Sequence, residues 1–198
     1  MVLLGIVRIV LNPYGEKKMK NEYKLEQKRY LVKIRGIKKL LMHKFVPQIG
    51  KGKKQVYEAE KEAEKGVYRN SEGKIYFPSS WFESTMIKMS TEFKMQGKKT
   101  YKEYIKGGII IEPEEIIADN QEYEIFECPV VINRSKVVAW RPMFKDWSCQ
   151  FEIVNNDPVN LDTTTLKEIL MSAGRLKGVG DWRPKYGQFV VEKFNEIK

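Results

Sequence analysis

Apolar and polar residues alternate along residues 30–36, and this alternation is the clearest strand signal in the chain. The two sets are Tyr30, Val32 and Ile34 on one side and Leu31, Lys33 and Arg35 on the other. A period of two residues is typical of a strand with one buried face. We therefore expect a half-buried strand that ends at Gly36.

Two stretches repeat their apolar residues with the period of a helix. The stripe in residues 79–94 is Phe82, Met86, Met89 and Phe93, and the stripe in residues 163–173 is Leu166, Ile169, Leu170 and Ala173. Side chains three and four residues apart share one helix face, so both stripes are expected in the core. Ser80 with Glu83 fits a capping box for the first helix, and Asp162 is a good N-cap for the second.

Short apolar runs between turn residues predict the remaining strands, at residues 107–113, 128–132, 136–142, 147–154 and 186–193. A polar helix before Gly66 and a turn at residues 70–73 lie between the first strand and the first apolar helix. Helices are too few, and strands too often consecutive, for a doubly wound parallel sheet. The order favours an α+β fold with a ferredoxin-like (RRM-like) βαββαβ core and insertions. We assign the core to residues 30–36, 79–94, 136–142, 147–154, 163–173 and 186–193, with insertions at residues 38–77 and 97–133.

The 198 residues suffice for one such domain, which we place at residues 30–198 after an N-terminal extension at residues 1–29. The apolar start of the chain is interrupted by Arg8 and is too short for a membrane span, which needs about 20 residues. It is either a first strand or a poorly ordered extension, and Met19 is an alternative translation start.

Positive charge is the compositional feature that changes this picture. The formal net charge is +10 and the sequence pI is about 9.4. Residues 17–54 alone hold 14 basic residues against two acidic ones. A surplus of this kind favours a polyanionic partner, either nucleic acid or an anionic membrane surface, and the uneven distribution favours nucleic acid.

Cysteine and histidine usage argues against a metal or disulfide framework. The two cysteines, Cys128 and Cys149, have no metal-ligand spacing, and His43 is the only histidine. We therefore expect reduced thiols, a cytoplasmic protein, no cofactor, no metal and no membrane association.

The stretch AGRLKGVGDWRPKYGQFVV, residues 173–191, combines glycines with basic and aromatic residues. It lacks the final Lys-Ser/Thr of a P-loop, and Arg183 stands where a dinucleotide fingerprint requires its third glycine. The expected order is also helix first and strand second, so no helix N-terminus faces a phosphate. Glycines nevertheless allow close approach to a phosphate chain, and their N–H groups can bind anions.

A short repeat connects this stretch to an earlier one. AWRPMF, residues 139–144, and DWRPKY, residues 181–186, share Trp-Arg-Pro, one variable residue and an aromatic ring. Two readings are open. The tryptophans and arginines contact a nucleic acid by stacking and phosphate pairing, or the tryptophans anchor the core while the arginines pair with Asp146 or Asp181.

Three stretches together resemble the RAMP superfamily, the ferredoxin-like RNA-binding proteins of CRISPR systems. They are VKIRGIKKLLMHK at residues 32–44, GKIYFPSSWFESTM at residues 73–86, and the loop GVGDWRPKYGQF at residues 178–189. They follow the βαββαβ order of that superfamily and are similar to its first strand, its helix entry and its C-terminal glycine-rich loop. The whole pattern is at least as similar to uncharacterised phage and prophage proteins encoded near replication or recombination genes.

The resemblance implies a non-enzymatic protein that binds single-stranded RNA or DNA with little sequence preference. It also implies head-to-tail association along the strand, in phage replication or recombination or in a CRISPR-like assembly. The expected contact residues are Lys38, Lys39, His43, Lys44, Arg141, Lys145, Arg175, Lys177, Gly178, Gly180, Trp182, Arg183, Lys185 and Tyr186. Two alternatives stay open. One is a metal-free RNA endonuclease that uses His43 with Lys44 or Tyr30 nearby, and the other is a phage inhibitor that binds a host complex.

Overall fold

The structure, a computed structural model, describes residues 9–11, 17–19, 27–45, 59–95, 97, 99–132 and 134–197. Much of the basic segment 17–54 therefore lies outside the described residues.

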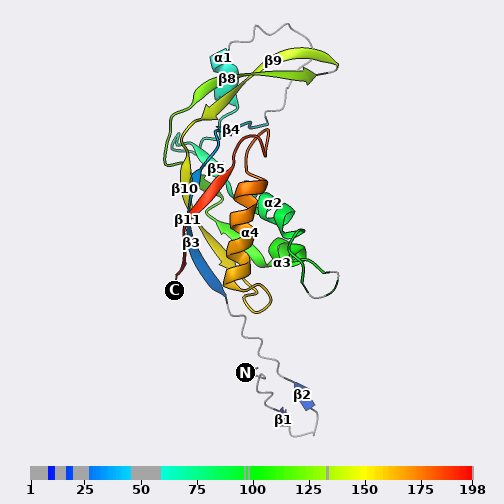
Figure 1. The fold of residues 1–198 in the computed structure, drawn as a ribbon. Helices are drawn as coiled ribbons and strands as arrows, with labels where there is room; N and C mark the ends of the chain where they lie inside the picture. Colours follow the sequence, from blue (N-terminus) through cyan, green and yellow to red (C-terminus); the bar gives the residue numbers. More distant parts are fainter. Residues whose placement is uncertain are drawn as a thin grey trace.

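A four-stranded antiparallel sheet with helices on one face forms the body of the protein (Figure 1). Its strand order is β11-β3-β10-β6, and the chain order is β3, α2, β6, β10, α4, β11. The bounds are Lys28–Gly36 for β3, Ser79–Ser90 for α2, Ile109–Glu112 for β6, Ser148–Asn155 for β10, Thr163–Leu176 for α4 and Phe189–Ile197 for β11. This arrangement confirms the α+β class and follows the ferredoxin-like βαββαβ pattern.

The second strand of this core is β6, and the expectation that residues 136–142 fill that place is wrong. Those residues belong to β9, Ser135–Phe144, which lies between β4, Leu40–Leu41, and β8, Glu124–Ile132, in a separate three-stranded sheet. Strand β10 follows β9 after a short connection but pairs with β3 and β6, with Phe151 opposite Val32 and Ile153 opposite Ile111.

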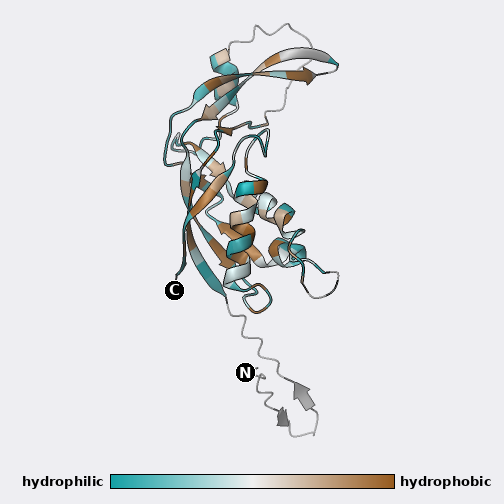
Figure 2. Ribbon diagram, in the orientation of Figure 1, coloured by the Kyte–Doolittle hydropathy of each residue, from teal (hydrophilic) through white to brown (hydrophobic). Residues whose placement is uncertain are grey.

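Hydrophobic residues fill the space between the sheet and the two long helices (Figure 2). The stripe on α2 is confirmed, since Phe82, Met86 and Met89 are buried and the partly buried Phe93 packs against the same core. The ring of Phe82 lies 4.8 Å from that of Phe151 on β10. Each large apolar side chain buried in this way contributes roughly 1.5–3 kcal/mol, so the apolar pattern dictates which faces meet.

The two helices begin differently. The carboxylate of Asp162 accepts hydrogen bonds from the backbone N–H groups of Thr164 and Thr165 at 2.9 and 3.0 Å, which confirms the predicted N-cap of α4. The capping box expected at Ser80 and Glu83 is wrong. Helix α2 starts at Ser79, two residues earlier than a cap at Ser80 requires, and its N-cap Pro78 makes no side-chain hydrogen bond. The N–H of Ser79 donates to the carbonyl of Glu114 at 2.9 Å.

Ion pairs cover the helix-free face of the sheet. Arg29 of β3 bridges Glu112 and Glu152 at 2.7 and 2.9 Å, Lys33 pairs with Asp119, and Arg35 pairs with Glu192 at 2.6 Å. The alternation predicted for residues 30–36 is thereby confirmed, with Tyr30, Val32 and Ile34 buried on the opposite face. The basic residues of β3 have carboxylate partners, so this strand adds little free positive charge.

The remaining elements are short. Strand β1, Ile9–Leu11, pairs with β2, Lys17–Met19, and β5, Tyr76–Pro78, pairs with β7, Glu115–Ile117. Helix α1, Ala59–Lys65, packs against β9, and α3, Lys102–Gly108, packs against α2. The turn expected at residues 70–73 is confirmed by the hydrogen bond from the N–H of Gly73 to the carbonyl of Asn70. Among the described residues, no helix has the length and apolar character needed to cross a membrane.

Candidate nucleic-acid interface

The glycine-rich loop, defined here as residues 177–188, is tied to α2 and to the segment around β4. The buried hydroxyl of Thr85 on α2 donates to the carbonyl of Gly178 at 2.6 Å. The N–H of Asp181 donates to the carbonyl of Leu41 on β4, and the N–H of Gly187 donates to the carbonyl of Lys39, both at 2.8 Å. Across the loop, the N–H of Val179 donates to the carbonyl of Gly187 at 2.9 Å. The base of the loop is therefore a hydrogen-bonded part of the fold.

The glycines serve this packing. A Cβ at Gly187 would lie 1.8 Å from the carbonyl oxygen of Val179, and a Cβ at Gly180 would lie 2.5 Å from that of Leu41. Both residues also have positive φ, at +72° and +77°, a region that side chains disfavour. The N–H groups of Gly178 and Gly187 donate within the protein. The structure thus gives these glycines a folding role, and the anion-binding role expected for their N–H groups stays a prediction.

The tip of the loop, residues 182–186, turns outward and carries the aromatic and basic residues. Trp182 is 37 % exposed and has a φ of +53°, which is rare for a bulky side chain. Its N–H donates to the Asp181 carboxylate at 3.0 Å, and its carbonyl accepts from the N–H of Tyr186 at 3.3 Å. The ammonium of Lys185 lies 5.7 Å from the centre of the Tyr186 ring.

The two Trp-Arg-Pro copies have different environments. Arg141, in the first copy, has a side chain that is only 14 % exposed, and its guanidinium lies 3.5 Å from the Asp181 carboxylate and 3.9 Å from that of Glu62. This is the pairing with Asp181 that one of the two readings required. In the second copy, Trp182 is exposed, and Arg183 has no carboxylate partner within the described residues. The first copy is internal, and the second is at the surface.

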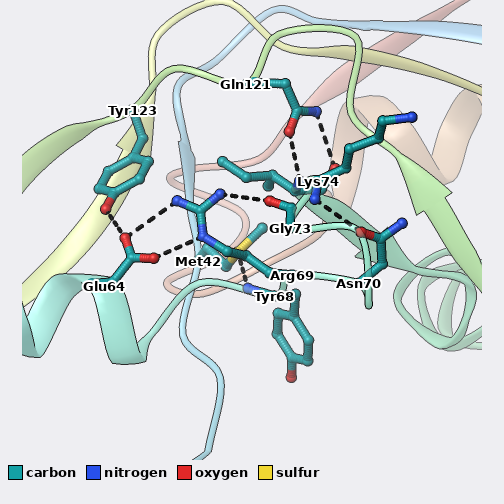
Figure 3. Close-up of polar contacts among 10 residues, drawn as sticks. Met42, Glu64, Tyr68, Arg69, Asn70, Gly73, Lys74, Gln121 and Tyr123 are labelled. Carbon is teal, nitrogen blue, oxygen red and sulfur yellow. Dashed lines mark hydrogen bonds and ion pairs between the residues drawn. The ribbon is translucent and has the colours of Figure 1, made fainter.

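Arg141, Asp181 and Glu62 form a charged cluster, and helix α1 supplies its Glu62 carboxylate. The contacts of Glu64 hold this helix in place (Figure 3). Glu64 accepts from Arg69 at 2.7 and 3.3 Å and from the hydroxyl of Tyr123. These hydrogen bonds, those from Arg69 first, lower the pKa of the Glu64 carboxyl. The anchored helix packs against β9 and carries Glu62. One carboxylate oxygen of Glu62 is buried and has no hydrogen-bond partner among the described residues.

His43 lies beside this cluster. The N–H of Met42 donates to the carbonyl of Pro142 at 3.0 Å, which aligns residues 42–44 with β9. Burial lowers the pKa of the His43 imidazole, and the charge of Arg141 lowers it further against the opposing effect of Asp181 and Glu62. Tyr30, expected near His43 in the nuclease alternative, is fully buried, with its hydroxyl 2.8 Å from that of Thr163.

The remaining predicted contact residues fall into two groups. Lys44, Lys145 and Lys177 have partners, since Lys44 lies over the Tyr68 ring, Lys145 pairs with Glu124 and Lys177 with Glu92. Lys38, Lys39 and Arg175 are exposed and have no ion-pair partner in the described part of the chain. The backbone of Lys38 and Lys39 adjoins the end of the glycine-rich loop, because the N–H of Lys38 donates to the carbonyl of Gln188 at 3.2 Å.

Sequence reasoning missed Phe126 and Glu62. Phe126 on β8 packs against both aromatic residues of the loop tip, with ring centroids 6.4 Å from Trp182 and 5.9 Å from Tyr186. The stretch around Phe126 was assigned to an insertion, and no motif marks it. Only the tertiary fold brings these residues next to the loop.

No metal centre is found among the described residues, because no three His, Cys, Asp or Glu residues cluster there. Burial raises the pKa of both thiols, at Cys128 and Cys149, so neither is an activated nucleophile.

Comparison with known proteins shows likeness in structure only. No family model matches the chain, and no curated protein matches it. A chain of the Type III-B Cmr-beta bound to cognate target RNA matches with a TM-score of 0.52 and 12 % identity, over 88 % of this chain and 62 % of that chain. Cmr6 from Pyrococcus furiosus matches with a TM-score of 0.43 and 14 % identity, over 84 % of this chain and 99 % of that chain.

At these identities the comparison with the Cmr-beta chain concerns the fold, and the present chain spans 62 % of that chain's length. The topology and this match agree with the ferredoxin-like expectation at the level of architecture. The chain is similar in fold to a chain of the Type III-B Cmr-beta structure.

Proposed function

We propose that this protein binds single-stranded RNA without cleaving it and with little sequence preference, through the tip of the glycine-rich loop. The observation that carries the proposal is the charge at this tip. Arg183 and Lys185 have no carboxylate partner in the described part of the chain, whereas Arg29, Lys33 and Arg35 on the sheet are all paired. Unpaired cations on a rigid loop suit a phosphate backbone.

Two further features support a polyanionic ligand at this place. Lys38 and Lys39 are exposed beside the end of the loop and extend the basic surface. The base of the loop is locked by hydrogen bonds to α2 and β4, so the tip is presented without a large ordering cost. The shared fold with a Cmr-beta chain solved with target RNA favours RNA over DNA.

Association of several copies along one strand is part of the proposal. The hairpin of β8 and β9 extends from the body of the protein (Figure 1) and exposes Val131 and Val138 at 68 % and 43 %. Exposed apolar side chains at a projecting element suit contact with a neighbouring molecule. Neither of the two structures described above supports a phage setting or single-stranded DNA, and both stay predictions.

Fluorescence polarisation tests the function directly. Labelled single-stranded RNA, its duplex and single-stranded DNA of the same sequence are titrated with the protein over a salt series. We expect the tightest binding to single-stranded RNA, with log K falling linearly as log salt rises. Absence of binding at low salt overturns the proposal and favours the protein-binding alternative. Mass photometry on RNA strands of increasing length tests assembly, which requires the number of bound copies to rise with length.

Metal-free RNA cleavage at His43 is a second candidate function, and one observation favours it. The imidazole is next to the Arg141 guanidinium, with its pKa lowered, so it is neutral at pH 7 and able to accept a proton. A neutral imidazole beside a cation is a pair of groups suited to deprotonating a 2′-hydroxyl. The test of this candidate is given in the Discussion.

A further inference from the structure

Three aromatic rings from two distant segments meet at the surface. Phe126 comes from β8, and Trp182 and Tyr186 come from the glycine-rich loop. The ring centroids of Trp182 and Tyr186 are 6.2 Å apart, and each lies 5.9–6.4 Å from that of Phe126. The ring planes meet at 86°, 56° and 49°, so no two rings stack in parallel. Within the cluster, no ring face is therefore covered by parallel stacking on another ring.

The backbone holds Trp182 outward against its own preference. Its φ of +53° is unfavourable for a residue with a large side chain. Asp181 maintains this conformation, because its carboxylate accepts the Trp182 N–H while also pairing with Arg141. In this conformation the indole stays 37 % exposed while it contacts the rings of Phe126 and Tyr186. Such outliers concentrate where a ligand is bound.

The charges around the rings select the class of ligand. The ammonium of Lys185 lies over the Tyr186 ring, and Arg183 follows Trp182 directly without a carboxylate partner in the described residues. An apolar peptide would gain nothing from these cations. A nucleotide satisfies both features, since its base offers a flat face and its phosphate carries negative charge.

We propose that Phe126, Trp182 and Tyr186 form a stacking platform for one unpaired nucleobase, preferentially a purine, of a bound RNA strand. The proposal rests on the RNA-binding function above and specifies how one nucleotide is held. Because the ring planes are inclined to one another, the base stacks on one exposed face, that of the Trp182 indole, and the two fused rings of a purine cover more of this face than a pyrimidine does. The hairpin of β8 and β9 thereby takes part in binding through Phe126, which lies outside the glycine-rich loop.

Abasic RNA separates stacking from phosphate contact. An oligoadenylate strand and the same strand with all internal bases removed carry equal charge, so only the intact strand can stack. We expect wild-type protein to bind the intact strand about tenfold or more tightly than the abasic one. Phe126→Leu and Trp182→Leu should each reduce this ratio to near one, while Trp182→Phe should keep most of it.

A charge variant is the matched control. Arg183→Ala should weaken binding of intact and abasic strands by the same factor, which leaves the ratio unchanged. If wild-type protein binds both strands equally and tightly, the platform is refuted while the RNA-binding function stands. If neither strand binds, the proposed function itself fails. A ratio that survives Phe126→Leu, in a variant with native circular dichroism, places the stacking elsewhere and also overturns the platform.

Discussion

Arg141 and Asp181, each from one Trp-Arg-Pro copy, form an ion pair with 3.5 Å between the guanidinium Nε and the carboxylate Oδ2. The pair joins β9 of the three-stranded sheet to the glycine-rich loop. The same carboxylate accepts the N–H of Trp182, so one aspartate links the internal copy to the exposed one. The repeat seen in the sequence is thus a pair of strand and loop segments that contact each other.

Removing Arg141 should destabilise the protein more than removing its partner. Arg141→Met leaves the carboxylates of Glu62 and Asp181 without the cation between them, and we expect a loss of about 2–3 kcal/mol in the free energy of unfolding. Asp181→Asn should cost about 1 kcal/mol. Urea unfolding measures both values. Lys74→Met removes an exposed pair with Glu72 and should change stability by less than about 0.5 kcal/mol, and an equal effect of all three variants would contradict this prediction.

Gly187 should tolerate no side chain. Gly187→Ala places a Cβ 1.8 Å from a backbone oxygen at positive φ, so we expect a loss well above 2 kcal/mol or failure to fold. Gly97 has a similar φ of +78° with nothing within 4 Å, so Gly97→Ala isolates the backbone cost of about 1 kcal/mol. Gly107→Ala, in open space without positive φ, should be neutral or stabilising. Thermal unfolding that ranks these variants in another order would refute the packing role of Gly187.

Capping by Asp162 should make the stability of α4 dependent on pH. The hydrogen bond from the Thr165 side chain, with those from the backbone N–H groups, lowers the pKa of this carboxyl below 3.8. The stabilisation is therefore complete above pH 3.8 and is lost as the pH falls through the lower folded value. Asp162→Ala should cost about 1 kcal/mol at pH 7, and less in acid. Asp162→Asn is the control, because its side chain caps the helix at every pH. A cost of Asp162→Ala that does not change with pH would contradict the role of the Asp162 carboxylate as the cap of α4.

The basic tip should determine how RNA binding responds to salt. Replacing Arg183 and Lys185 together with alanine should weaken binding and reduce the slope of log K against log salt by about 0.7 for each lost contact. Lys167→Ala removes an exposed cation near the opposite end of α4 and should leave the slope unchanged. Polarisation titrations at several salt concentrations give both slopes. Equal slopes for wild type and the double variant would remove the tip from the interface.

Cleavage at His43 should follow the deprotonated imidazole. The lowered pKa predicts a rate that rises as the pH increases, with the midpoint of the rise below pH 6.5. End-labelled RNA is incubated with wild type, His43→Ala and Arg141→Met in the presence of a chelator. If the protein is this nuclease, both variants lose activity, because His43→Ala lacks the base and Arg141→Met lacks the adjacent cation. Cleavage that is absent in wild type, or equal in His43→Ala, excludes it.

Sequence periodicity predicted β3, α2 and α4 because each is long enough to show its pattern. Burial of one face imposes a period of two on β3, where Val32 and Ile34 are fully buried, and a period near 3.6 on α4. The cap at Asp162 was also predictable, because its hydrogen bonds are local. Strand β6 was missed as a core element, since four residues with Ile109 and Ile111 buried resemble any short apolar segment.

The sequence alone was sufficient to predict the α+β class, the basic charge and the combination of glycine, basic and aromatic residues in the loop. Only the tertiary structure decided which of them are available to a ligand. Arg141 and Arg183 occupy the same place in the same motif, yet Arg141 is held between two carboxylates, whereas Arg183 is only partly buried and has no carboxylate partner in the described residues. The physical reason is that availability depends on contacts between segments remote in the chain. Phe126 contacts the loop, and Arg141 meets Glu62 and Asp181, only because the fold brings β8, β9, α1 and the loop together.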